Sequence, residues 1–480
     1  MTAPPPDPSS PSPAAHLRRD ALRILAEGVR AAEPARLVAG ALADDPELER
    51  WAHEVAGAGA GGRTVLVGVG KAAPAMARGA AHLLGPLLDG GVLLAPHGAV
   101  RPQGLPSTMV LRGGGHPLPD AAGVEAAEEI RDLAAGLSNG DRLLALISGG
   151  GSALLSLPRP PLDLHGLRSA TRLLLESGAP IGVVNRVRAR LELLKGGGLA
   201  EVAAPARVLG LVLSDIPGGH AELVASGPLS PLPPDAREEA AVRALLRRPE
   251  VRDRMPAAVW QVLESEAVRS EVGAPGRGPA AGPDQDAARR GPPTGPPAVL
   301  RMVGSGRDAA EGAARAARAL GYATRVVTTA FRGEARAVGR GLARMGMAIR
   351  DGAAPPRPPA CLVLAGETTV HVTGSGSGGR NQEVALGAAL ALAGWDGIVV
   401  ASLGTDGRDG PTDAAGALAD GTTVSRARAG GRSVAGALAA NDAYPLLAGL
   451  GDLLRTGATG TNVADLLLVL VSADGRGNSP

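Results

Sequence analysis

Three times along this chain, an apolar run typical of a buried β-strand leads into a glycine-rich turn and then into a helix. The strand-like runs are Arg63–Val69, Arg142–Ile147 and Cys361–Ala365. Parallel strands need a crossover connection, and that connection is usually a helix. The repeated order of strand, turn and helix therefore predicts an α/β fold with a mainly parallel sheet in its first part.

The length of 480 residues exceeds what one ordinary hydrophobic core supports, which favours two domains or three. We expect an N-terminal domain over residues 16–270 and a C-terminal α/β domain over residues 298–475. Residues 271–297 are Gly, Pro and Ala with scattered charge, which predicts a linker or a disordered insertion. Residues 1–15 are rich in Pro and Ser without an apolar run, which is typical of a disordered tail and not of a signal peptide.

The overall composition excludes several classes of function. The formal net charge is +2, and no basic block is interleaved with aromatic residues, so a dedicated nucleic-acid surface is not expected. No window reaches the roughly 20 apolar residues of a membrane span, which favours a soluble cytoplasmic protein. The single cysteine, Cys361, excludes an intramolecular disulfide, and its apolar neighbours predict a buried, inert thiol.

The stretch from Gly366 to Glu383 carries the strongest signal for a binding site. Four of its glycines fall within six positions, from Gly374 to Gly379, immediately before a predicted helix. Such a loop lets the backbone approach an anion, and the helix N-terminus behind it presents unpaired N–H groups. Arg380 at this junction has the fork of donors that suits a phosphate or a carboxylate. An ordinary glycine-rich surface loop is the alternative.

The first turn, Gly68-Val69-Gly70-Lys71, is compatible with two known motifs but matches neither completely. A Walker A loop needs a hydroxyl residue after the lysine, and Ala72 stands there. The dinucleotide fingerprint fits as Gly68-x-Gly70-x-x-Ala73, but Asp89, the candidate ribose-binding acid, precedes the next apolar run instead of ending it. Lys71 serves a transferring phosphoryl group or a carboxylate more naturally, and a solvated lysine at a helix start is the alternative.

Two further segments add candidate groups for binding anions. Ser148-Gly149-Gly150-Gly151-Ser152 follows the second strand and favours phosphate binding by backbone amides over a plain turn. A basic helix ends in Lys195 and three glycines, which fits either a helix C-terminus or a cationic wall beside a phosphate.

Earlier in the chain, Asp120 is predicted to N-cap a helix over Ala121–Leu137, whereas the role of His116 stays ambiguous.

Aspartates follow two other strand-like runs at their carboxyl ends. Asp215 follows a buried run at the edge where open parallel sheets place ligand chemistry, so it is a candidate magnesium ligand or base. Asp406, Asp409 and Asp413 follow another apolar run, and such a cluster can coordinate a hard cation or orient a substrate hydroxyl. Turn chemistry alone also explains Asp-Gly pairs.

Eight motifs occur in an order that is specific when they are taken together. They are Gly68-Val69-Gly70-Lys71-Ala72-Ala73, Gly114-Gly115-His116-Pro117, Ser148-Gly149-Gly150-Gly151-Ser152, Lys195-Gly196-Gly197, Ser214-Asp215-Ile216-Pro217, the stretch Gly366–Glu383, Thr405-Asp406-Gly407-Arg408-Asp409-Gly410-Pro411-Thr412-Asp413 and Thr459-Gly460-Thr461-Asn462-Val463. From about residue 16 to residue 472, the chain closely resembles glycerate 2-kinases of class II, whose C-terminal part is a MOFRL domain.

The resemblance implies ATP- and Mg²⁺-dependent transfer of a phosphoryl group to the 2-hydroxyl of D-glycerate. It also implies an active site in the cleft between two α/β domains, of which the first is Rossmann-like. It places Lys71 and Arg380 in catalytic roles. The positions of Asp215 and Asp406 after strand-like runs add Asp215 as a third catalytic candidate, and Asp215 and Asp406 as the candidate metal ligands. The expected ATP-binding residues are Gly68, Gly70, Ser148, Gly149, Gly150, Gly151, Ser152, Lys195, Gly376, Gly378, Gly379 and Asn381. The expected substrate-binding residues are Lys71, Arg380, Glu367, Thr412 and Asp413.

The chain departs from the family pattern at two places. Gly218-Gly219-His220 stands where an acidic Gly-Asp-Asp is usual, and Arg190 and Glu192 replace the usual His and Ser of the basic helix. An NAD(P)H-dependent hydroxypyruvate reductase, with His116 as its only obvious proton donor, and a ligand-binding protein without catalysis are the alternative functions. A homo-oligomer is compatible with the sequence.

Overall fold

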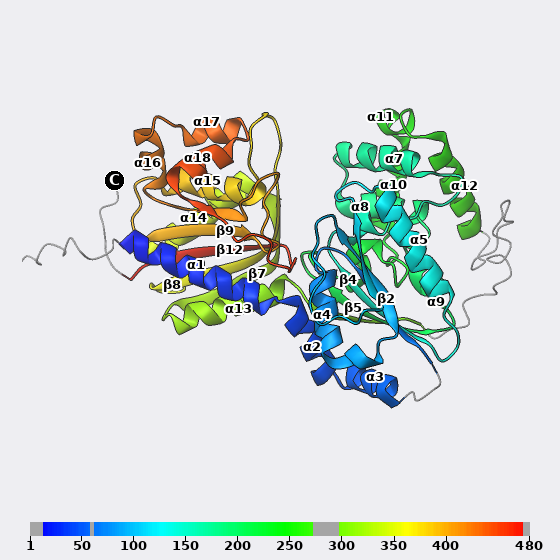
Figure 1. Ribbon diagram of the computed structural model, residues 1–480. Helices are drawn as coiled ribbons and strands as arrows, with labels where there is room; N and C mark the ends of the chain where they lie inside the picture. The colour runs from blue at the N-terminus through cyan, green and yellow to red at the C-terminus, as the bar shows by residue number, and fades with distance from the viewer. Residues whose placement is uncertain (1–12, 58–61, 272–296, 474–480) are drawn as a thin grey trace, which may run out of the picture. The chain divides into compact units, whose positions relative to one another are not determined.

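The structure, a computed structural model, describes residues 13–57, 62–271 and 297–473. These residues form two compact units, each with its own sheet (Figure 1). The β1–β6 unit comprises Pro34–Ser214 and His220–Val303, and the β7–β12 unit comprises the chain up to Glu33, Asp215–Gly219 and the chain from Gly304 onward. Most of the predicted tail (residues 1–12) and of the predicted linker (residues 272–296) lies outside the described residues.

A six-stranded sheet forms the centre of the β1–β6 unit. Its strands are β1 (Thr64–Val69), β2 (Gly90–Pro96), β3 (Met109–Gly114), β4 (Arg142–Ser148), β5 (Arg207–Leu213) and β6 (Val299–Gly304). The order is β3-β2-β1-β4-β5-β6, and the strands from β3 to β5 run parallel. The predicted α/β fold with a mainly parallel sheet is therefore confirmed. In this order β1 and β4 are neighbours at the topological switch point, where open sheets bind ligands.

The helices of this unit surround the sheet and form a separate helical cluster. They are α2 (Pro34–Asp44), α3 (Pro46–Gly57), α4 (Ala73–Leu84), α5 (Ala121–Ala135), α6 (Gly151–Leu154), α7 (Leu164–Glu176), α8 (Ile181–Leu191), α9 (Gly198–Ala203), α10 (Ala236–Arg247), α11 (Pro249–Arg252) and α12 (Ala257–Glu271), with 3₁₀ turns η1 (Gly85–Leu87) and η2 (Ala221–Ser226). The predicted N-cap of α5 is confirmed, because Asp120 accepts a hydrogen bond from the backbone N–H of Gly123 at 2.9 Å. Helix α8 ends at Leu191, since Glu192 is extended, so Lys195 lies beyond its last turn.

A second six-stranded sheet, of mixed direction, forms the centre of the β7–β12 unit. Its strands are β7 (Ala323–Glu334), β8 (Ala360–Thr369), β9 (Ile398–Gly404), β10 (Gly416–Asp420), β11 (Leu453–Leu454) and β12 (Asp465–Val471), in the order β11-β10-β9-β12-β8-β7. Strands β7 and β8 are parallel, and the other neighbours are antiparallel. The helices are α1 (Pro13–Ala31), α13 (Gly306–Ala319), α14 (Ala335–Arg350), α15 (Arg380–Leu392), α16 (Thr423–Ala429), α17 (Val434–Ala439) and α18 (Ala443–Leu450).

Helices cover both faces of this second sheet. Successive residues of a strand face opposite sides, and on β12 Leu467, Val469 and Val471 pack in one core with residues of α14 and α15. The preceding residue, Leu466, faces the opposite side and lies beside Gly28 of α1. Helices α1 and α13 thus cover one face, and α14 and α15 cover the other (Figure 1). Because both faces are covered, every residue of β12 is buried.

The N-terminal helix α1 belongs to the β7–β12 unit, whereas the sequence-based boundaries assigned it to the N-terminal domain. Arg18 forms ion pairs at 2.6 Å with both Asp420 and Asp452. On the same helix, Asp20 accepts a hydrogen bond from the Tyr322 hydroxyl at 2.6 Å. Buried carboxylates need charged or hydroxyl partners. Helix α1 supplies the arginine that pairs with Asp420 and Asp452, and its own Asp20 is bonded by the hydroxyl of Tyr322. Helix α1 is therefore a structural part of the β7–β12 unit, most of which is formed by the chain from Gly304 onward.

Two expectations from the sequence concern membrane-spanning segments and the single cysteine. In the part of the chain that the structure describes, no helix is both long enough and apolar enough to cross a membrane. Cys361 is fully buried in β8, and burial raises the pKa of its thiol to about 12. The predicted burial of the cysteine is therefore confirmed, and the raised pKa favours the unreactive thiol form.

Helices α1 and α13 approach each other at two glycines. A Cβ atom on Gly312 of α13 would lie 2.2 Å from the Cβ atom of Ala31 and 3.5 Å from the Cα atom of Gly28. No real Cβ atom tolerates the first of these distances, so the close helix crossing requires glycine.

We expect the substitution Gly312→Ala to lower the free energy of unfolding by about 1–3 kcal/mol, because the added methyl group overpacks the α1–α13 contact. Gly341→Ala is the matched control, since no atom lies within 4 Å of the new Cβ atom in α14. The control should gain about 0.5–1 kcal/mol from the lost flexibility of glycine. Urea denaturation measures both changes, and equal stabilities of the two variants would contradict the packing described here.

Candidate active site

Two glycine-rich turns interlock at the carboxyl ends of β1 and β4. The backbone N–H of Lys71 donates to the carbonyl of Gly149 at 2.9 Å, and that of Ala72 donates to Ser148 Oγ at 3.1 Å. Gly70 has a φ of +121°, and a Cβ atom there would lie 2.3 Å from Ser148 Oγ. Only glycine meets both conditions, so the predicted turns come together as one structure at the topological switch point.

Lys71 lies on this joined structure beside a histidine from a third strand end. A Cβ atom built on Gly150 would lie 3.1 Å from Lys71 Cγ and 3.4 Å from His116 Nε2. The lysine side chain and the imidazole therefore flank the turn that follows β4. Among the predicted ATP-binding residues, Gly70 and Ser148–Ser152 are brought together with Lys71, whereas Gly68 is buried within β1.

A buried cluster of charges lies beneath the second turn. Arg188, Glu192 and Lys195 are at most 5% exposed. Arg188 Nη2 donates to the carbonyl of Ser152, and Lys195 Nζ donates to the carbonyl of Leu155 at 2.7 Å. Lys195 Nζ also donates to Glu192 Oε2, and Arg188 Nε lies 3.7 Å from Glu192 Oε1. The cluster therefore holds the carbonyl group of Ser152, at the end of the turn, and that of Leu155, after α6, in place.

The position of Lys195 changes its predicted role. The sequence assigned Lys195 to ATP binding, but its ammonium group is buried and bonded to Glu192 and to the backbone. We therefore expect it to position the segment after the Ser148–Ser152 turn, through the Leu155 carbonyl, and not to contact ATP. Sequence reasoning missed Arg188, and it noted Glu192 only as a departure from the family pattern. The i, i+3 spacing of Glu192 and Lys195 was the available signal.

Strained backbone lies against the same turn. Ala225 and Ser226 have φ values of 56° and 62°, although neither is glycine. The hydroxyl groups of Ser226 and Ser152 are 2.9 Å apart, and the Ser226 carbonyl accepts from the backbone N–H of Gly196 at 3.1 Å. Such strain persists only where surrounding contacts fix it, and it clusters at functional sites.

In the β7–β12 unit, Arg380 begins α15 and is already held by a carboxylate. Its Nε and Nη2 atoms donate to Asp465 at 2.6 and 2.8 Å, and Nη2 lies 3.5 Å from Glu367. Burial lowers the pKa of the guanidinium, but the Asp465 carboxylate outweighs burial, so the pKa is raised overall. Asp465 therefore occupies the two N–H donors of the Arg380 guanidinium that were predicted to bind a ligand. The side chain nevertheless remains 31% exposed.

The predicted anion site at the N-terminus of α15 is filled by a carboxylate of the protein itself. Asp409 accepts from the backbone N–H groups of Asn381 and Gln382 at 3.0 and 2.9 Å, and from their side-chain amides at 3.2 and 3.0 Å. Burial raises the pKa of Asp409, while the backbone donors oppose the rise. Asn381 also donates to Asp465 at 3.1 Å, so it joins two buried carboxylates instead of facing a ligand.

The glycines before α15 serve close packing. A Cβ atom on Gly379 would lie 2.3 Å from Asp409 Cγ, and one on Gly376 would lie 2.4 Å from Asp442 Cβ. On Gly378 the nearest atom would be Ala443 Cβ at 3.2 Å. These distances give the three glycines a packing role, in which they admit the neighbouring chain, and their part in binding a phosphate stays a prediction.

The predicted substrate-binding residues divide into two groups. Glu367 lies beside Arg380, and Thr412 Oγ1 accepts from Gln382 Nε2 at 3.2 Å, so both belong to the Arg380 surroundings. Asp413 belongs elsewhere. It is exposed and accepts hydrogen bonds from the Tyr444 hydroxyl at 2.6 Å and from Arg455 Nε at 3.1 Å.

The two candidate metal ligands are single carboxylates. Asp215 Oδ2 accepts from Asn462 Nδ2 at 2.9 Å, and Asp406 Oδ1 accepts from the backbone N–H of Arg408 at 3.0 Å. Within residues 13–57, 62–271 and 297–473, no group of three or more His, Cys, Asp or Glu side chains is arranged to hold a metal ion. Mg²⁺ in phosphoryl-transfer sites is bound by one or two carboxylates plus phosphate oxygens, so the donor chemistry of Asp215 fits that ion.

Comparisons with known proteins identify the family of the chain. A model described as a domain of unknown function, DUF4147, matches residues 20–264, and the MOFRL family model matches residues 360–465. The D-glycerate 2-kinase of Thermotoga maritima is 36% identical over 409 residues, which cover 85% of this chain and 91% of that protein. The glycerate 2-kinase of Pyrococcus horikoshii is 33% identical, with 95% and 98% covered. The chain belongs to the glycerate 2-kinase family.

A solved structure supports the same conclusion for the fold of this glycerate 2-kinase family member. The crystal structure of the Thermotoga maritima glycerate kinase matches with a TM-score of 0.74 at 33% identity, covering 95% of this chain and 99% of that one. A relative from Agrobacterium vitis, 36% identical with 85% of this chain and 87% of that protein covered, carries the provisional name hydroxypyruvate reductase. The family is thus shown, and the reductase alternative needs a direct test.

We expect Asp465→Asn to lower the free energy of unfolding by about 2 kcal/mol, because it removes a buried, charged acceptor from Arg380. Asp413→Asn is the matched control, since Asp413 also pairs with an arginine but its side chain is 63% exposed. The control should change stability by no more than about 0.5 kcal/mol. Equal losses in urea denaturation would show that the buried Arg380–Asp465 pair contributes no more to the free energy of unfolding than the exposed Asp413–Arg455 pair does.

The buried Lys195 predicts a pH-dependent stability. Burial lowers the pKa of its ammonium group to about 8, from 10.5 in an exposed lysine, and Glu192 opposes only part of that shift. Between these two pH values the unfolded chain binds more protons at this site than the folded chain does. The contribution of Lys195 to the free energy of unfolding must therefore rise with pH across this window.

The variant Lys195→Met removes this titration. We expect the difference in urea midpoint between the wild type and the variant to change in favour of the wild type from about pH 8 to about pH 10.5. Parallel curves for the two proteins over this range would contradict the assignment of a depressed lysine pKa.

Proposed function

We propose that the protein transfers the γ-phosphoryl group of ATP to the 2-hydroxyl group of D-glycerate, giving ADP and 2-phosphoglycerate. The observation that carries this proposal is the joined pair of turns at β1 and β4, with Lys71 on the first and Gly149 bonded to its backbone. Backbone amides of glycine-rich turns bind phosphate oxygens, and a lysine beside them neutralises phosphate charge. Family membership supplies the substrate class, since the relatives are named glycerate 2-kinases.

In the proposed reaction, a bond forms between the 2-oxygen of glycerate and the γ-phosphorus while the bond from that phosphorus to the ADP oxygen breaks. Lys71 and Arg380 neutralise charge on the transferring group and on the glycerate carboxylate. Asp215 or Asp406 accepts the hydroxyl proton. Mg²⁺, when bound through Asp215, supplies further neutralisation of the phosphate oxygens. Catalysis of this kind is mostly positioning and electrostatic stabilisation.

Several residues serve the reaction without touching the reacting atoms. Ser148 Oγ fixes the first turn by accepting from the backbone N–H of Ala72, and Arg188 fixes the Ser152 carbonyl of the second turn. Lys195 fixes the Leu155 carbonyl that follows α6. Asp465 orients the Arg380 guanidinium through two hydrogen bonds. These contacts pre-organise the groups that meet the phosphoryl group.

The structure weakens the reductase alternative at one residue. Asp89, the candidate ribose-binding acid, accepts a hydrogen bond from the backbone N–H of Thr64 at 2.7 Å. Thr64 is the first residue of β1, so Asp89 lies at the amino end of that strand, opposite the Gly70 turn. A ribose-binding acid belongs at the carboxyl end of the neighbouring strand.

A coupled assay tests the proposed function directly. Purified protein is incubated with D-glycerate, ATP and Mg²⁺, ADP release is followed, and the phosphate position in the product is identified by NMR. We expect 2-phosphoglycerate, with activity lost on chelation by EDTA and restored by excess Mg²⁺. A parallel sample contains hydroxypyruvate with NADH or NADPH. Oxidation of the nicotinamide without ADP release in the first sample would overturn the proposal in favour of a reductase.

Substitutions of the two cations test their roles. We expect Lys71→Ala and Arg380→Ala each to lower kcat by about 10³ or more, because each removes a charge that meets the transition state. Arg344→Ala is the control, since Arg344 is an exposed arginine of α14 and should leave kcat unchanged. Near-wild-type turnover in both active-site variants, with the assay itself positive, would reject the residue assignment while leaving the kinase activity standing.

A further inference from the structure

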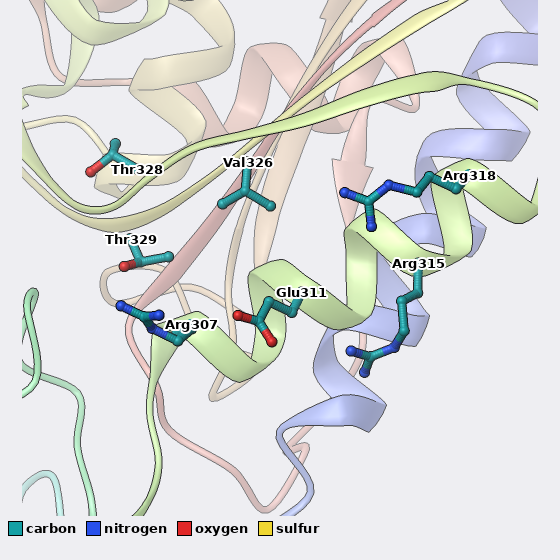
Figure 2. A pocket seen from close by; sticks show the side chains of 7 residues that line it. All are labelled: Arg307, Glu311, Arg315, Arg318, Val326, Thr328 and Thr329. Atoms are coloured by element: carbon teal, nitrogen blue, oxygen red, sulfur yellow. The ribbon is translucent and has the colours of Figure 1, made fainter.

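A groove of about 530 Å³ lies between α13 and the edge strand β7, and it is lined mainly by cationic and hydroxyl side chains. Figure 2 shows the lining residues, which come from these two elements alone: Arg307, Glu311, Arg315, Arg318, Val326, Thr328 and Thr329. None of them belongs to the Arg380 surroundings or to the joined turns. The volume is within the range of pockets that bind small molecules.

The strand contributes two successive threonines because its regular pairing is interrupted. In a regular strand, adjacent residues point to opposite faces. The register between β7 and β8 shifts between Val326 and Thr328 and again between Thr328 and Phe331. A β-bulge of this kind re-aims side chains, and here both Thr328 and Thr329 line the same groove. The Thr328 hydroxyl accepts from the backbone N–H of Ala330 at 3.1 Å, and its own O–H remains a donor.

The helix contributes a continuous charged stripe. Arg307, Glu311, Arg315 and Arg318 follow one another at intervals of three or four residues, so they share one face of α13. Across the described residues, none of the three arginines forms an ion pair, even with Glu311. The face therefore carries an excess of two positive charges beside the threonines. Arg315 and Arg318, three residues apart, repel one another, and a bound anion would relieve that repulsion.

We propose that this groove binds a phosphorylated small molecule as a second site, separate from the proposed catalytic residues. Arginine guanidinium groups bind phosphate oxygens in a bidentate manner, and threonine hydroxyls add neutral donors. Glu311, in the middle of the stripe, accepts a hydrogen bond from a hydroxyl or amino group of the same ligand. The ligand is therefore a phosphate ester or a nucleotide, and the groove does not suit an apolar compound. This proposal does not rest on the kinase activity.

Arginine-specific modification by phenylglyoxal, with peptide mass spectrometry, tests the site residue by residue. The probes are inorganic pyrophosphate, ATP and 2-phosphoglycerate, each with the full-length protein. We expect at least one probe to slow modification of Arg315 and Arg318 several-fold while leaving Arg344 unchanged. Equal protection of Arg344 would mean general charge screening, and no protection by any probe would mean no phosphate site. Either outcome overturns the proposal, and the choice of protecting probe separates a nucleotide from a phosphate ester.

A charge reversal tests the same site by binding. We expect Arg315→Glu with Arg318→Glu to weaken binding of the protecting probe, measured by calorimetry, by about tenfold or more, since charged hydrogen bonds are lost. Arg344→Glu is the control, since it reverses the charge of one exposed arginine of α14 outside the groove. The Lys71→Ala variant should keep the calorimetric signal assigned to the groove. Binding that is lost in Lys71→Ala but unchanged in the double variant would place the anion at the catalytic residues and reject a second site.

Discussion

The carboxylate of Asp409 at the start of α15 organises the β7–β12 unit. A helix start carries N–H groups without intrahelical partners and a partial positive charge, and Asp409 satisfies two of these groups. Because the carboxylate is buried, its charge is costly unless it is surrounded by donors. Asn381 connects it to Asp465, and Asp465 in turn fixes Arg380. The arginine expected to meet substrate is thus held by a chain of buried contacts that begins at the helix start.

The β1–β6 unit follows a different constraint, which is the close approach of two turns. Gly70 and Ser148 come within contact only because β1 and β4 are neighbouring parallel strands. The buried pair of Glu192 and Lys195 then holds the Leu155 carbonyl, at the end of the short helix that follows the second turn. The positive charge of Lys195 is buried here because the carboxylate of Glu192, three residues earlier, neutralises it. The geometry of the joined turns in this unit is therefore supported by a buried ion pair.

Local sequence patterns predicted the strands, the turns and the parallel first sheet, because neighbouring residues encode each of these features. They did not predict which anion occupies the start of α15, since Asn381 and Asp409 are 28 residues apart and Arg380 and Asp465 are 85 apart. Those pairs depend on the strand order of the second sheet. Lys195 shows a second limit, because a lysine before glycines has the same local pattern whether it faces a ligand or is buried. The glycines before α15 are equally ambiguous, since phosphate and neighbouring backbone both demand the absence of a side chain.

The position of α1 has a consequence for how the chain is made and divided. Arg18 pairs with Asp420 and Asp452, across separations of 402 and 434 residues. The helix is therefore synthesised long before the strands that it covers, such as β12. Non-local contacts of this kind slow folding and leave apolar surface exposed in the meantime. A fragment beginning at residue 298 would lack the helix that covers Leu466, so one cut in the chain cannot yield both units in complete form.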